Sequence, residues 1–381
     1  MAAVLVAGGL TATVPAVADT TTFNPFVANN GFSIVATGNA TIGNNEIEGS
    51  IAAFGSIEAT TSNFPLVHKV AGVGDYAVPT VDGDPVRILA GSFVGTGNIA
   101  VTNAGHEGSP GVSDAIAKLA SIDGLQGGPR GDWLRVSNSY GSSDQGNLDL
   151  EALKLSTNPT LEGNVKTEHG SVADYFEGLG QQVEQTNSCL LAMYGSELAT
   201  RVQVQTDGGM VSPSGFSSTQ PNYLDYSEVA GKIIKQDKFG GYVPTAAAPL
   251  VIRVADGTTT LGQVNVEGWS SSAGAQQTFS RYIMFDLSQV TNPVTINGLE
   301  MGAIWAPNSD VTFDSNVTHN GQIFAGGNFT SRGAGELHHH TFMGALPCGA
   351  SDPWIGTTVS VPGSEGKVVP FTGGTLVDTV A

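Results

Sequence analysis

The chain has 381 residues and a formal net charge of -19, from 34 acidic and 15 basic side chains. A field of this sign repels nucleic acid, so the charge excludes nucleic-acid binding as a function. Charged residues make up 13% of the chain, against roughly 25% in typical soluble proteins, while hydrophobic residues make up 40%. Disordered chains show the opposite balance, so the composition predicts a folded core.

The first 18 residues are small and apolar and end in Ala16, Val17 and Ala18, an A-x-A pattern. This pattern is typical of the cleavage site of a secretory signal peptide, although the basic segment that normally precedes the apolar stretch is missing. We therefore predict a signal-peptide remnant over residues 1–18 and an exported protein. The alternative is a short apolar strand.

Short apolar runs separated by Gly, Asn and Asp dominate residues 23–101 and return over residues 250–325. The runs recur about every 8–12 residues and alternate apolar with small polar positions, which is typical of strands that are half buried. We predict a mainly β fold over residues 19–349, an irregular parallel β-solenoid (β-helix) with a flanking α-helix. No strict repeat length and no regular Thr-x-Thr pattern is visible along the sequence.

A helical insertion is predicted near residues 111–200. Residues 113–119 fit a helix with a Ser or Asp cap, and residues 149–155 are a weaker case. The strongest helix covers residues 171–194, where Ser171 can cap the first turn. Gly178 and Gly180 weaken its middle, so we expect two pieces that pack along the β structure.

Residues 350–381 are rich in Gly, Pro, Ser and Val and are predicted to form a tail or a linker to an anchor. A segment within them resembles a sortase sorting signal of the LPxTG type: Val369, Pro370, Phe371, Thr372 and Gly373. The apolar span and basic tail that follow such signals do not occur in residues 374–381. A terminal strand is therefore the alternative.

The chain has two cysteines, Cys189 and Cys348, which are too few for a disulfide-based fold. In an oxidising compartment they form a candidate disulfide. The alternative is two unrelated buried thiols.

One cluster has the chemistry of a metal site. Alternation along a strand would place Glu336, His338 and His340 on one face, and two imidazoles with a carboxylate can bind Zn²⁺. The alternative is a rim of hydrogen-bonded residues. The Asp residues at 82–84 and 310–314 could offer oxygens to Ca²⁺, or cap turns instead. No other cofactor is predicted.

Several segments resemble, in order, the motifs of the choice-of-anchor A domain family of bacterial surface proteins. At the C-terminal end these are residues 301–311 (MGAIWAPNSDV), 320–327 (NGQIFAGG) and 335–344 (GELHHHTFMG); at the N-terminal end they are 23–27 (FNPFV) and 47–55 (IEGSIAAFG). Ser50 stands where the family has a basic residue, and Phe54 where it has a small one. The resemblance implies extracellular display and no settled enzymatic activity.

No Ser-His-Asp arrangement around a nucleophile and no phosphate-binding glycine loop occurs in the sequence, so we predict no enzyme. We predict an adhesin or structural protein displayed at the cell surface, whose binding face meets extracellular matrix, a glycan or a cell-surface partner. A self-assembling fibre or coat subunit is one alternative. An ice-binding protein or a secreted polysaccharide-active solenoid is another.

Overall fold

The computed structural model describes residues 21–67, 76–102, 116–138, 146–151, 160–268 and 278–348. These residues are mainly β, with few helices and extensive parallel pairing, as the sequence predicts. None of the helices within these ranges has the length and apolar character that a membrane span requires. The predicted signal-peptide remnant, the tail and the sorting signal at residues 369–373 lie outside the described residues.

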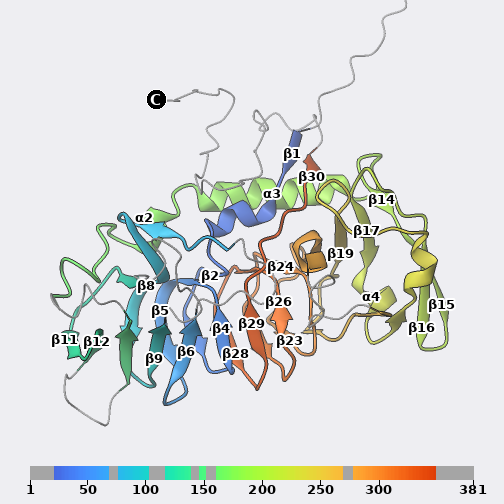
Figure 1. Cartoon of the computed structure of the whole chain (residues 1–381). Helices are drawn as coiled ribbons and strands as arrows, with labels where there is room; N and C mark the ends of the chain where they lie inside the picture. Colours follow the sequence, from blue (N-terminus) through green and yellow to red (C-terminus); the bar gives the residue numbers. More distant parts are fainter. Residues whose placement is uncertain are drawn as a thin grey trace, which may run out of the picture.

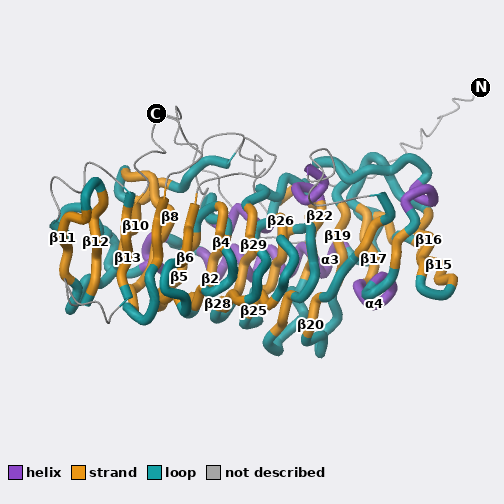
Figure 2. Tube along the Cα trace, turned by 60° about the horizontal axis from the view of Figure 1, so that its bottom comes forward, coloured by secondary structure: helices purple, strands orange, loops and turns teal. Residues whose placement is uncertain are grey.

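Parallel strands stack side by side along the length of the molecule in three ladders (Figures 1 and 2). The first, the helix-covered ladder, has this order: β14 (Thr200–Arg201), β17 (Asn222–Asp225), β19 (Leu250–Arg253), β22 (Ile283–Asp286), β24 (Ala303–Ala306), β27 (Ile323–Ala325), β2 (Ile34–Ala36), β5 (Ile51–Ala59), β8 (Asp84–Val94), β10 (Ile116–Leu119).

The second, the threonine ladder, has this order: β20 (Thr260–Leu261), β23 (Val294–Ile296), β25 (Val311–Asp314), β28 (Phe329–Arg332), β3 (Ala40–Ile42), and then the second halves of β5 and β8. Strands β5 and β8 thus belong to two ladders, and their register shifts between Ala53 and Ser56, where one ladder passes into the next.

The third ladder has this order: β26 (His319–Asn320), β29 (Glu336–His338), β4 (Glu46–Glu48), β6 (Phe64–Val67), β9 (Ile99–Thr102), β13 (Asn147–Leu150), β12 (Trp133–Ser137), β11 (Gln126–Arg130). Its last two pairings, β13 with β12 and β12 with β11, are antiparallel. A separate sheet has the order β15 (Gln203–Asp207), β16 (Met210–Ser214), β18 (Ile233–Ile234), β21 (Asn265–Val266). Short strand β7 (Thr80–Val81) pairs with β8, and β1 (Thr21–Phe23) pairs with β30 (Leu346–Cys348).

The first strand of the ladders in chain order, β2, lies in the middle of this stack rather than at one end. Strand β2 lies between β27 and β5, so an N-terminal strand pairs on one side with a strand almost 300 residues later. From there the chain proceeds to one end of the stack, crosses to the other end and returns to β27 (Figure 1). The N-terminal and C-terminal segments therefore share one continuous core of buried apolar side chains.

The predicted helix at residues 171–194 is confirmed, and it has two pieces. Helix α2 (Val172–Tyr175) is capped by Ser171, whose hydroxyl accepts a hydrogen bond from the Asp174 amide. Helix α3 (Leu179–Met193) begins after Gly178, which adopts the left-handed conformation that favours glycine. Helix α3 lies on the segment that carries the chain from one end of the stack to the other, and it runs along the outer side of the helix-covered ladder (Figure 1).

The helix predicted at residues 113–119 is wrong, because Ile116–Leu119 is strand β10, which extends the helix-covered ladder beside β8. All four of its residues are buried, and pairing with β8 overrides the local helical pattern. Of residues 149–155, the first two belong to strand β13, and 152–159 lie outside the described residues. Within the described residues, the other helical pieces are α4 (Tyr226–Val229), η1 (Pro25–Asn29), η2 (Gln236–Phe239) and η3 (Thr278–Tyr282).

Candidate functional site

Five threonines stand in register on consecutive strands of the threonine ladder. Strand pairing places Thr260 beside Thr295, Thr295 beside Thr312, Thr312 beside Thr330, and Thr330 beside Thr41. Because neighbouring strands lie about 4.7–4.9 Å apart, the column extends over roughly 19 Å. We call it the threonine column.

The threonine column faces away from the core. Thr312 is half-buried between Val311 and Phe313, which are 1% and 0% exposed. The same alternation of buried and partly exposed positions occurs in β23, β28 and β3. Since side chains alternate between the two faces of a strand, the threonines point outward while their neighbours fill the core.

Asx side chains hold the turns that lead into this ladder. The backbone N–H of Asn328 donates to Asp310 Oδ1 over 2.7 Å, and the backbone N–H of Asn39 donates to Asn328 Oδ1 over 2.9 Å. The Ser56 amide continues the series by donating to Asn39 Oδ1 over 2.8 Å. Each side chain thus bonds the backbone of the next strand's turn, which fixes the register that aligns the threonines.

Few charges lie along the threonine column, and those described below are held by hydrogen bonds or an ion pair. Thr41 Oγ1 and Thr96 Oγ1 both donate to the carboxylate of Glu58, each over 3.0 Å. Arg332 Nε lies 2.9 Å from Asp314 Oδ2. These two residues follow Thr330 and Thr312 by two positions on strands β28 and β25. The face is therefore regular, hydroxyl-rich and weakly charged, which suits an ordered neutral surface better than a small ionic ligand.

A second candidate site lies on the third ladder, where β29 pairs with β4. The predicted residues Glu336 and His338 are close together, with 3.0 Å between Glu336 Oε2 and His338 Nε2. Glu48 Oε2 lies 3.6 Å from the same nitrogen. Glu46, which the sequence analysis did not select, has a carboxylate oxygen within 4.8 Å of donor atoms of both Glu336 and His338.

His340 is not part of this group. Strand β29 ends at His338, so the alternation that would place His340 on the same face stops there. Burial lowers the pKa of His340 to about 3, helped by the nearby His338, and neither ring nitrogen has a hydrogen-bond partner among the described residues. Burial likewise lowers the pKa of His339 to about 3. Both rings are therefore neutral side chains packed inside the fold at neutral pH.

A sequence model of the protein family described as "Putative Ice-binding-like adhesive domain" matches residues 25–339. The chain belongs to this family of adhesive domains. The matched range contains all three ladders and helix α3, so the threonine column and the Glu–His group both lie inside the adhesive domain. The narrower resemblance to choice-of-anchor A domains stays a prediction.

Among solved structures, an ice-binding protein from an Arctic yeast, studied for its antifreeze activity, matches the adhesive domain. The identity is 10% and the TM-score 0.29, over 83% of this chain and 94% of that chain. A likeness this distant carries no argument here. No curated protein matches the sequence.

The structure places the aspartates considered for Ca²⁺ in ion pairs and turns. Lys118 Nζ lies 2.9 Å from Asp84 and 3.9 Å from Asp82. Asp310 accepts the turn hydrogen bond from Asn328, and Asp314 pairs with Arg332. Asp310 thus caps a turn, as one of the two alternatives predicts, whereas Asp82, Asp84 and Asp314 are in ion pairs.

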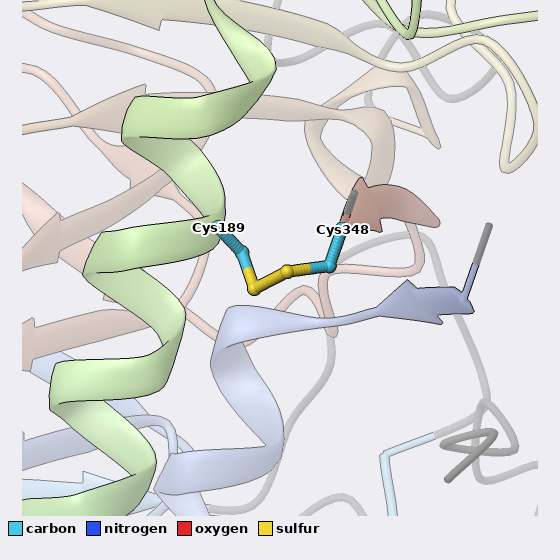
Figure 3. Close-up of a disulfide and its surroundings, with 2 residues drawn as sticks. All are labelled: Cys189 and Cys348. Atoms are coloured by element: carbon cyan, nitrogen blue, oxygen red, sulfur yellow. A yellow bond between two sulfur atoms is a disulfide. The ribbon is translucent and has the colours of Figure 1, made fainter. Parts of the chain in front are cut away.

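The two cysteines form a disulfide that joins α3 to β30 (Figure 3). Their Cα atoms are 4.9 Å apart, and both residues are buried. Strand β30 also pairs with β1, so this bond ties the crossing helix to the first and last described strands. Of the two alternatives for Cys189 and Cys348, the structure supports pairing.

Proposed function

We propose that this adhesive domain acts outside the cell, at the cell surface, by presenting the threonine column as its binding face. In this interpretation the three ladders are the faces of an irregular β-solenoid, and binding rather than catalysis is its activity. The in-register threonines carry the proposal. The disulfide supports export, because such bonds persist in oxidising compartments.

The favoured ligand of the face is ice. A rigid row of hydroxyl and methyl groups repeats at the strand spacing, and ice presents oxygen atoms at a similar interval. Rigidity matters because side chains that are already ordered lose little entropy on binding a solid. A neutral, regular polysaccharide is the second candidate, since its hydroxyls also repeat along a line.

Replacing Thr312 by tyrosine tests the face. Thr312 is the central residue of the column, and a bulky ring there would prevent a flat solid from approaching its neighbours. We expect Thr312→Tyr to reduce binding about tenfold or more. The measurements are thermal hysteresis and fluorescence of labelled protein on ice, and pull-down on insoluble cellulose and chitin with assay of released sugars.

The matched control is Thr206→Tyr, which changes an exposed threonine on β15, outside the threonine ladder. It should bind like the unchanged protein, and both variants should keep its thermal stability. The proposal would be contradicted if Thr312→Tyr bound ice as well as the unchanged protein does. It would also be contradicted if the unchanged protein bound none of these surfaces. Binding to a polysaccharide alone would select the second candidate, and sugar release would indicate catalysis.

Antiparallel hairpins weigh against the alternative of a fibre that grows end to end. The hairpin of β11 and β12 lies at one end of the stack and that of β15 and β16 at the other (Figure 1). Edge strand β11 carries Pro129 and Arg130, and both features discourage pairing with another chain. We therefore expect a monomer in sedimentation at high concentration; filaments in electron micrographs would contradict this.

A further inference from the structure

Parallel pairing of β29 with β4 brings carboxylates together from the two ends of the chain. Glu336 lies directly beside Glu46, and His338 lies beside Glu48. Like charges on adjacent strand positions repel each other and destabilise a sheet. Three carboxylates therefore lie around one imidazole, and carboxylate oxygens with an imidazole nitrogen are ligands that a divalent transition-metal ion binds.

The distances are close to those of a metal site. In a tetrahedral zinc site, ligand atoms lie about 2.0–2.2 Å from the ion, which places them about 3.3–3.6 Å from one another. Between two of the proposed ligands, His338 Nε2 lies 3.0 Å from Glu336 Oε2, slightly less than that separation. Glu48 Oε2, on the neighbouring carboxylate, lies 3.6 Å from the same nitrogen. A carboxylate oxygen of Glu46, whose side chain is half-buried, lies within 4.8 Å of the ligand atoms of both Glu336 and His338.

The group is also held in orientation by its surroundings. Asn45 Nδ2 donates to Glu336 Oε1 over 2.8 Å, while Oε2 of the same carboxylate faces His338. The side chain of His338 is 10% exposed, that of Glu336 is 32% exposed, and Glu46 is half-buried. Hydrogen bonds that fix the direction of a ligand favour metal binding, and partly exposed carboxylates leave a path for an ion to enter.

We propose that Glu46, Glu336 and His338 bind one divalent transition-metal ion, with Glu48 as a neighbouring carboxylate. Zn²⁺ is the best match, because imidazole and carboxylate together suit it, whereas Ca²⁺ and Mg²⁺ prefer oxygen ligands alone. The ion would connect β4 with β29, which are far apart in the sequence: Asn45, just before β4, and Glu336 on β29 are 291 positions apart. It would thus link the N-terminal and C-terminal segments where they meet, and binding would stabilise the fold.

Zinc titration of the full chain, freed of metal with a chelator, tests the site. We expect calorimetry to give one Zn²⁺ per chain at micromolar or tighter affinity, and saturating Zn²⁺ to raise the melting temperature by about 2–5 °C. Ca²⁺ at the same concentration should give neither effect. Glu46→Gln should weaken zinc binding about tenfold or more and abolish the thermal shift.

Glu46 is half-buried, so its amide variant is expected to fold; His338→Gln supplies a second removal of one ligand. Glu58→Gln, a carboxylate change on the threonine ladder, should keep zinc binding unchanged. Absence of zinc binding would overturn the proposal. Equal binding by Glu46→Gln, His338→Gln and the unchanged chain would also overturn it, because the ion would then be adventitious. Neither result bears on ice binding by the threonine column.

Discussion

Replacing Trp305 by alanine is expected to lower the free energy of unfolding by about 3–5 kcal/mol, the cost of emptying a large buried aromatic site. Trp305 is 0% exposed and lies on strand β24. Its ring stacks on Phe324 with 4.6 Å between centroids, and its Nε1 donates to Asn187 of helix α3 over 2.9 Å. The variant thus removes both the packing and the hydrogen bond that join the helix to its ladder.

Guanidinium unfolding with its midpoint and slope measures this loss. Trp305→Phe keeps most of the ring and should cost less than Trp305→Ala. Trp133→Ala provides the matched control, because Trp133 on β12 is only half-buried. Equal losses for Trp305→Ala and Trp133→Ala would mean that α3 contributes little through this contact.

Local signals in the sequence were enough to predict the helix and its break. Ser171 caps the first piece through its hydroxyl, and Gly178 separates the two pieces with a backbone conformation that few other residues adopt. The mainly β character was equally accessible, because alternating apolar positions within each short run report a half-buried strand. These features depend only on residues close together in the chain.

The threonine column could not be found by the same reasoning. Its members are separated by long turns, and Thr41 lies beside Thr330 from the opposite end of the sequence. A search for Thr-x-Thr examines neighbours within one strand, whereas the column has one threonine per strand. The available signal was a threonine flanked by buried apolar residues in several successive runs, as in β23 and β25.

The Glu–His group was predicted in part for the same reason. Glu336 and His338 alternate on one strand, so local geometry places them together. Glu46 and Glu48 alternate in the same way on β4, but only the pairing of β4 with β29 shows that the two strands meet. His340 was included because the strand was expected to continue, and it ends two residues earlier.

Removing the disulfide is expected to lower the free energy of unfolding by about 2–4 kcal/mol. Cys189 and Cys348 are 159 positions apart, and closing so long a loop restricts the unfolded chain by about 5 kcal/mol in the chain-entropy model, an upper value. The double variant Cys189→Ala with Cys348→Ala is preferred, because both sites are buried and serine would place unpaired hydroxyls there.

Dithiothreitol supplies an independent test of the same bond. Reduction should lower the unfolding midpoint of the unchanged protein toward that of the double variant, and it should leave the double variant unaffected. The bond joins α3 to β30, and β30 pairs with β1, so its loss should loosen the attachment of the first and last described strands before the ladders unfold. Hydrogen exchange is therefore expected to increase first in β1 and β30, while β24 and β27 stay protected. Equal exchange in all four strands would mean that the disulfide stabilises the fold only through the unfolded chain.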